Sequence, residues 1–286
     1  MTNSIEISGL CKSYGDFALR NVSLTLPGGA IMGLIGENGA GKTTTIKCIL
    51  NLIRRDAGTI TLMGHDNILE ERQAKEDVGV VLDECFFHDS LRPRDIGSIL
   101  APAYRSWDHA LFRDYLDKFK LPERKFIKEF SRGMKMKLSL AAALAHRPRL
   151  LILDEATAGL DPVVRDEILD EFLGFIQDED HSILISSHIT SDLEKVADYI
   201  TYIHRGQVVL SDAKDAILDR YGRLGCTAAQ LAEVDPGDLL RVRKGSFGCE
   251  GLVADREAFR RNYPELTVDP ASLEDIMLLI GKGEAV

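Results

Sequence analysis

A glycine-rich segment near the N-terminus has the residue types and spacing of a phosphate-binding loop. Residues 36–43 match the pattern G-x-x-x-x-G-K-[ST] and directly follow an apolar stretch, residues 30–35. The glycines allow the backbone to curl until successive N–H groups point toward phosphate oxygens. A helix that we expect to begin near Lys42 adds the positive end of its dipole. The segment therefore predicts a site for the phosphates of ATP.

The side chains of this loop predict separate contacts with ATP and Mg²⁺. Lys42 supplies a positive charge for the β- and γ-phosphates, and we count it among the catalytic residues. The Thr43 hydroxyl is placed to ligate Mg²⁺, and we expect Thr44 to contact the α-phosphate. The nucleotide-binding residues expected in this loop are Gly36, Asn38, Gly39, Ala40, Gly41, Lys42, Thr43 and Thr44.

Two adjacent carboxylates follow a second apolar stretch, residues 150–153. We expect Asp154 to hold Mg²⁺ through water, and Glu155 to polarise the attacking water as a general base. Two acids at the end of a strand are also compatible with a solvated turn. The phosphate loop upstream favours the catalytic interpretation, so the sequence predicts ATP hydrolysis.

Alternating strand and helix patterns predict an α/β fold that positions these residues. Short, continuously apolar runs are typical of strands in a parallel sheet with helices on both faces, and such sheets bind ligands at the carboxyl ends of their strands. Two N-terminal segments alternate apolar and polar residues, which predicts a small antiparallel β subdomain. The predicted strands are residues 5–10, 22–26, 30–35, 78–82, 150–153, 182–186 and 199–204, and the predicted helices are residues 43–53, 107–120, 134–146, 163–176 and 189–197.

Two regions lie outside this alternation. Strand patterns disappear between about residues 84 and 147, which predicts a helical insertion. After about residue 215 only weak patterns remain: strands at 239–242 and 251–253, and a helix at 273–280 that begins after a Ser272–Asp275 capping pair. We therefore divide the chain into a nucleotide-binding domain, residues 1–215, and an α+β accessory region, residues 216–286.

Three further motifs surround the acidic pair in a fixed order. Ser131-Arg132-Gly133 precedes it, residues 156–161 follow it, and Ser187-His188 ends the next predicted strand. Together with the phosphate loop, this set resembles the nucleotide-binding subunit of an ABC transporter over residues 3–215. The resemblance implies a P-loop NTPase core and an ATPase that drives a membrane permease.

The resemblance also assigns roles that the residues alone leave open. In the family a second subunit completes the site, so Ser131 and Gly133 are expected to contact the γ-phosphate held by the opposite chain. Asp161 resembles the aspartate that acts across this dimer, and His188 the catalytic switch histidine that contacts the γ-phosphate. Tyr14 matches the aromatic residue on which adenine stacks. Without the family, His188 is more often structural, and Tyr14 is an ordinary surface tyrosine.

Three positions depart from the family pattern. The signature that usually reads Leu-Ser-Gly-Gly-Gln is Phe-Ser-Arg-Gly-Met at residues 130–134, which retains the serine and the second glycine. Asp83 stands where the family has a glutamine that touches Mg²⁺, and we expect it to reach the metal through water. Ala156 replaces the usual proline, a change that we expect to be mild.

These motifs are similar to those of bacterial exporter-type ATPase subunits of the bacitracin-resistance and acetoin-utilisation kind. Their permease is a separate polypeptide, so the expected partners are a second ATPase subunit, identical or different, and an integral-membrane permease. We expect permease docking near residues 83–94, with Phe86 and Phe87 as candidate contacts, although burial in the core is the favoured prediction for each phenylalanine. The expected location is the cytoplasmic face of the plasma membrane.

The composition argues against several other classes of protein. A net charge of −10 disfavours nucleic acid as a partner, because such binding relies on cationic side chains. The five cysteines contain no Cys-x-x-Cys pair, which predicts reduced thiols in the cytoplasm. No segment resembles a signal peptide or approaches the roughly 20 apolar residues that span a bilayer.

Two alternatives to a transport ATPase remain at this stage. One is a soluble member of the same superfamily that acts on ribosomes or DNA. Translation-factor relatives carry two ATPase domains and DNA-repair relatives insert long coiled coils, whereas this chain has one phosphate loop and no heptad repeat. The other alternative is a nucleotide sensor without turnover, which the presence of Glu155 disfavours.

Overall fold

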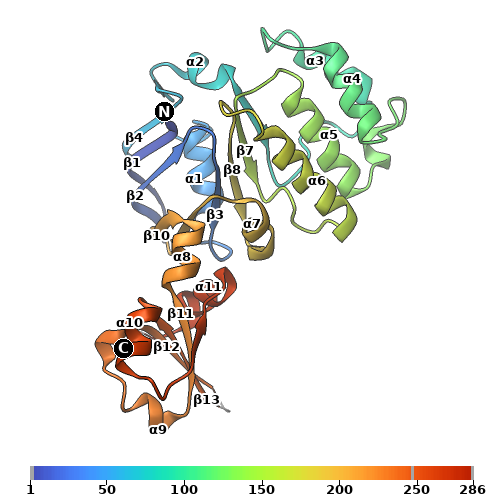
Figure 1. Ribbon diagram of the computed structural model, residues 1–286. Helices are drawn as coiled ribbons and strands as arrows, with labels where there is room; N and C mark the ends of the chain where they lie inside the picture. Colours follow the sequence, from blue (N-terminus) through green and yellow to red (C-terminus); the bar gives the residue numbers. More distant parts are fainter. Residues whose placement is uncertain (1–2, 246–247, 285–286) are drawn as a thin grey trace.

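The computed structural model describes residues 3–245 and 248–284, and these residues form three β-sheets with helices around them (Figure 1). The largest sheet has the strand order β10-β9-β3-β8-β7-β6. Every neighbouring pair of strands in this sheet is parallel except the pair β9–β10, which is antiparallel. This arrangement confirms the predicted mostly parallel sheet. The bounds are β3 Ile31–Ile35, β6 Val78–Val81, β7 Leu150–Asp154, β8 Ser182–Ser187, β9 Tyr199–His204 and β10 Gln207–Ala213.

The central strands β3, β7 and β8 are buried on both faces, as expected for largely apolar strands inside a sheet, whereas the edge strand β10 has no buried residue. On β3, Ile31 and Ile35 belong to one hydrophobic cluster, whereas Met32 and Leu34 belong to another. Residues from α5, α6 and α7 fill the first cluster, and residues from α1 fill the second. The bounds of these helices are Lys42–Ile49 (α1), Arg132–Leu144 (α5), Pro162–Phe175 (α6) and Thr190–Val196 (α7). The two clusters fix the sheet, and therefore the loops at the carboxyl ends of its strands.

The N-terminal antiparallel sheet has the order β2-β1-β4-β5. It shares the second cluster with α1, so this helix lies between the two sheets. Its first two strands contain the predicted ones, while β4 and β5 were not predicted. The bounds are β1 Asn3–Tyr14, β2 Phe17–Pro27, β4 Ala57–Leu62 and β5 His65–Asp66.

The segment from residue 84 to residue 147 is entirely helical or irregular, as predicted. It contains α3 (Pro93–Leu100), α4 (His109–Lys118), a 3₁₀ turn (Ile127–Glu129) and α5. A further short helix, α2 (Glu71–Glu76), precedes β6. In Figure 1, α3 and α4 lie at the end of the molecule away from the C-terminal sheet.

The C-terminal region contains a four-stranded antiparallel sheet of order β12-β13-β11-β14 with its own small core. Ser272 and Asp275 form the predicted capping box at the start of its last helix. The elements are α8 Lys214–Arg220, β11 Gly222–Cys226, α9 Ala228–Leu231, a 3₁₀ turn at Pro236–Asp238, β12 Leu239–Gly245, β13 Gly248–Val253, α10 Arg256–Asn262, β14 Val268–Pro270 and α11 Leu273–Lys282.

Two sequence predictions about local structure were wrong. The first helix ends at Ile49 rather than at residue 53, because Asn51 adopts a left-handed conformation (φ 49°) that an α-helix does not continue through. Phe86 was expected in the core, yet 72% of its surface is exposed. Its neighbour Phe87 is partly buried and packs against the main core, as predicted.

A buried histidine in the helical segment makes stability depend on pH. The His146 side chain is 1% exposed and stacks on Tyr104 with ring centroids 4.0 Å apart. Burial lowers the pKa of His146 below its ordinary value. The unfolded chain therefore binds this proton at a higher pH than the folded chain does, and stability falls as the pH is lowered through about 6.5.

We predict that His146→Phe, which keeps an aromatic ring on Tyr104, reduces this loss of stability. The free energy of unfolding changes with pH more steeply in the wild type than in the variant, and the two slopes differ by at most about 1.4 kcal/mol per pH unit. Urea unfolding at pH 7.5 and 5.5 measures it. Equal pH dependence in the two proteins would contradict the assignment to His146.

Candidate nucleotide site

The glycine-rich loop joins the carboxyl end of β3 to α1. Gly41 precedes the first residue of α1 with φ 117°, and no side chain caps the helix. A Cβ atom at Gly41 would lie 2.6 Å from Cδ2 of Leu19 and 3.0 Å from Cζ of Phe17. Only glycine fits this conformation and this space. The N–H groups at the start of α1 are therefore free to bind an anion.

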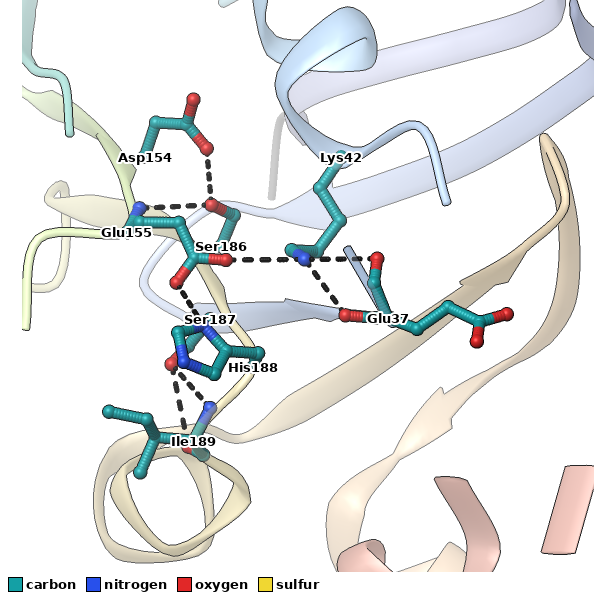
Figure 2. A network of polar contacts seen from close by, with 9 residues as sticks. Glu37, Lys42, Asp154, Glu155, Ser186, Ser187, His188 and Ile189 are labelled. Carbon is teal, nitrogen blue, oxygen red and sulfur yellow. Dashed lines mark hydrogen bonds and ion pairs between the residues drawn. The ribbon is translucent and has the colours of Figure 1, made fainter. Parts of the chain in front are cut away.

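The Lys42 ammonium group is held at the centre of the loop (Figure 2). Its side chain is only 5% exposed, and Nζ donates a hydrogen bond to the carbonyl oxygen of Gly36 at 2.8 Å and to that of Glu37 at 3.4 Å. Oε1 of Glu155 lies 3.2 Å from the same Nζ. A buried ammonium requires such partners, because an isolated charge is strongly disfavoured away from water.

Glu155 lies between Lys42 and His188. Its Oε2 is 2.6 Å from Nδ1 of His188 (Figure 2). The backbone of Glu155 has φ 52°, and its N–H lies 3.1 Å from Oγ and 3.2 Å from the carbonyl oxygen of Ser186. Backbone strain of this kind, held in place by neighbouring hydrogen bonds, is concentrated at functional sites. Ser186 therefore fixes a strained glutamate beside a lysine and a histidine.

Asp154 is buried at the end of β7, with 1% of its surface exposed. The Ser186 hydroxyl donates to its Oδ1 at 2.5 Å. Burial raises the pKa of Asp154, and hydrogen bonds from Ser186 and Thr43 oppose this shift. Asp83 and Glu155 contribute to the upward shift through charge repulsion. The hydroxyl groups of Ser186 and Thr43 thus hydrogen-bond to the Asp154 carboxylate, which lies near two further carboxylates.

A cavity of about 460 Å³ lies over these groups. It brings together most of the residues that the sequence indicated, although Gly36, Ala40, Asp154 and Tyr14 do not line it. Tyr14 is 45% exposed in the β1–β2 hairpin. The lining residues are Phe17, Glu37, Asn38, Gly39, Gly41, Lys42, Thr43, Thr44, Asp83, Arg132, Glu155, Ala158 and His188.

Ser131, Gly133 and Asp161 lie outside the cavity lining. Ser131 caps the start of α5, where its hydroxyl accepts a hydrogen bond from Met134 N–H at 3.3 Å. Asp161 caps the start of α6, where its carboxylate accepts from Val164 N–H at 3.1 Å. The two helix starts pack together, since a Cβ at Gly133 would lie 3.1 Å from Cγ1 of Val164. All three residues therefore gather at one place outside the cavity lining, while Arg132, between Ser131 and Gly133, lines the cavity.

Comparisons with known proteins decide the family. A family model described as ABC transporter matches residues 19–158. The chain is 34% identical over 294 residues to the Nod factor export ATP-binding protein I of Burkholderia lata, covering 96% of this chain and 95% of that protein. The chain belongs to the ABC transporter family. It is an ATP-binding and ATP-hydrolysing subunit of such a transporter, as the resemblance implied.

Other relatives match a shorter part of this ABC transporter subunit. The bacitracin transport ATP-binding protein BcrA of Enterococcus faecalis is 36% identical over 208 residues, covering 72% of this chain and 68% of that protein. A solved structure of the ATP-binding subunit of an ABC transporter superimposes with a TM-score of 0.68 at 27% identity, covering 74% of this chain and 91% of the other. In residues 3–245 and 248–284 no helix is long and apolar enough to cross a membrane.

Sequence motifs did not indicate three residues that shape this site. Phe17 lines the cavity from β2, Glu37 lines it from within the loop, and Ser186 holds both acidic residues. Ser186 directly precedes Ser187-His188 at the end of a strand, so the sequence contained a signal that could have indicated it. Phe17 reaches the loop only through the packing of the antiparallel sheet, and no local pattern marks that contact.

We predict that Gly41→Ala lowers ATP affinity at least about tenfold, because the added methyl group collides with Leu19 and the backbone is strained by about 1–3 kcal/mol. Gly174→Ala is the matched control, since a Cβ there meets no atom within 4 Å and α6 is a regular helix. Titration with a fluorescent ATP analogue measures both. Unchanged affinity in the Gly41 variant would contradict the geometry described for the loop.

Proposed function

We propose that two ATPase subunits close around ATP, and that Glu155 is the general base for its hydrolysis. The observation that carries this proposal is the position of the Glu155 carboxylate, 3.2 Å from Lys42 Nζ and 2.6 Å from His188 Nδ1. A phosphate that enters the loop competes with Glu155 for Lys42. Glu155 is then free to accept a proton from a water molecule that attacks the γ-phosphorus, while His188 contacts the γ-phosphate.

The residues around Asp154 fit Mg²⁺. This ion prefers oxygen ligands, and it usually binds through one or two carboxylates, water and the phosphates of the nucleotide. Asp154 offers a buried carboxylate, Thr43 a hydroxyl group, and Asp83 a second carboxylate at the cavity wall. We propose these three residues as its ligands, directly or through water. When bound, Mg²⁺ would neutralise charge that develops on the phosphate oxygens.

We propose that the helix starts at Ser131 and Asp161 complete the site of the opposite chain. Ser131, Gly133 and Asp161 share one part of the molecule and do not line the cavity of their own chain. The start of α5 offers backbone N–H groups to the γ-phosphate. Tyr14, at the exposed hairpin, is proposed to stack on adenine.

The chain works with a membrane permease, and we propose that export is the direction of transport, since the Nod factor relative is named for export. This role places the chain at the cytoplasmic face of the plasma membrane. We also propose that residues 1–215 form the ATPase domain and residues 216–286 an accessory region connected through α8.

An apolar groove offers a docking surface for the permease. It has a volume of about 740 Å³ and lies beside β6, the edge strand of the parallel sheet. The sequence prediction placed docking near residues 83–94, none of which lines the groove, although Leu82 directly precedes that segment. Phe86 is 72% exposed and belongs to that segment. The groove is lined by Leu50, Leu52, Glu71, Arg72, Lys75, Glu76, Val78, Val80, Leu82, Ala103 and Tyr104.

We predict that Glu155→Gln retains ATP binding and lowers turnover at least about 100-fold, because the amide does not accept the proton of the attacking water. The stalled ATP complex accumulates as a dimer. Phosphate release and size-exclusion chromatography with ATP and Mg²⁺ provide the two readouts. Hydrolysis at the wild-type rate would overturn the assignment of the base.

A second prediction concerns the groove. Leu52, 57% exposed, lines it, and Leu52→Asp should weaken association with the permease at least about tenfold because a charge replaces an apolar contact. Leu69→Asp is the control, since Leu69 is 85% exposed and lies outside the groove. Co-purification with the permease measures both. Equal effects of the two variants would argue against this docking site.

A further inference from the structure

Helix α11 belongs to the C-terminal region, but its buried face packs into the core of the ATPase domain. Leu273, Ile276 and Leu279 are no more than 1% exposed and share a hydrophobic cluster with Leu193 of α7 and Tyr202 of β9. Figure 1 shows α11 at the junction between the C-terminal sheet and the parallel sheet. The last helix therefore contacts two elements that lead to the nucleotide site.

One of these elements is α7, which begins two residues after His188. The N–H group of Leu273, at the start of α11, donates to Oε1 of Glu194 in α7 at 3.0 Å. The Ser187 hydroxyl accepts from the N–H group of Ile189 at 2.9 Å and holds the turn that joins His188 to α7. Hydrogen bonds thus connect the start of α11 to the helix that follows the histidine.

The second element is β9, whose last residue contacts the phosphate loop. The Tyr202 hydroxyl donates to the carbonyl oxygen of Met277 at 3.2 Å. At the end of α11, the position that a Cβ of Gly281 would occupy lies 3.7 Å from Oη of Tyr202 and 3.8 Å from Oε2 of Glu37. The other carboxylate oxygen of Glu37 lies 2.8 Å from Nδ1 of His204, the last residue of β9.

Glu37 connects this contact to the group that binds phosphate. Its side chain lies between α11 and His204, while its carbonyl oxygen accepts from Lys42 Nζ at 3.4 Å. The Glu37 carboxylate therefore lies beside the end of the C-terminal helix. A side chain larger than hydrogen at Gly281 would meet the Glu37 carboxylate directly.

We propose that α11 is a positioning element for ATP binding, which acts on the phosphate loop through Gly281 and Glu37. The C-terminal region then influences the affinity for ATP without contacting the nucleotide. By linkage, ATP binding stabilises the docked position of α11 to the same extent. The proposal rests on the assignment of residues 36–44 as the ATP-binding loop.

A charge placed at Gly281 tests the contact in the full chain. Gly281→Glu sets a carboxylate against that of Glu37, whereas Gly281→Gln has nearly the same size without the charge. We expect the Glu variant to bind ATP at least about fivefold more weakly than the Gln variant. Adding Glu37→Gln to Gly281→Glu should recover most of the difference, because it removes the repulsion. Thermal unfolding verifies that each variant is folded.

Two further measurements separate positioning from general effects. Lys282→Glu places negative charge on the exposed side of the same helix and should leave ATP affinity unchanged. Hydrogen exchange of α11 amides in the wild type should slow when ATP is added. Equal affinities of the Glu and Gln variants, an equal loss in Lys282→Glu, or unchanged exchange would overturn the proposal. Failure of the wild type to bind ATP would instead overturn the proposed function.

Discussion

The contacts of the Glu155 carboxylate with Lys42 and His188 join three segments that are far apart in the sequence. Lys42 follows β3, Glu155 follows β7 and His188 follows β8, and these strands are neighbours in the parallel sheet in the order β3-β8-β7. Their carboxyl ends meet at one edge because every strand points in the same direction. Burial of both sheet faces fixes the strands, and the loops between them carry the chemistry.

The same architecture explains why the site is sensitive to elements outside it. The phosphate loop packs against β2 through Gly41 and against β9 through the Glu37–His204 contact, and the Glu37 carboxylate lies near Gly281 of α11. Residues of the N-terminal sheet and of β9 thus contact the loop, and the end of the C-terminal helix lies near it. The position of the loop therefore rests on packing with the N-terminal sheet and β9 as well as on its own motif.

The sequence predicted those parts of the site whose residues are neighbours along the chain. Residues 36–44, Asp154, Glu155 and His188 each follow an apolar strand, so motif and periodicity support each other. Elements with little burial were missed, such as α2, in which only Ala74 is buried. Packing between distant segments, such as Phe17 beside the loop and Gly281 near Glu37, was also missed, because no local pattern encodes it.

The most direct test of the account is the structure of the Glu155→Gln variant with ATP and Mg²⁺. The account predicts two chains around each nucleotide, with Lys42 of one chain on the phosphates and the Ser131 hydroxyl of the other at hydrogen-bond distance, about 2.7 Å, from the γ-phosphate. It also predicts the side chain of residue 155 beside a water molecule in line for attack. ATP held by a single chain, or residue 155 turned away from the γ-phosphate, would contradict it.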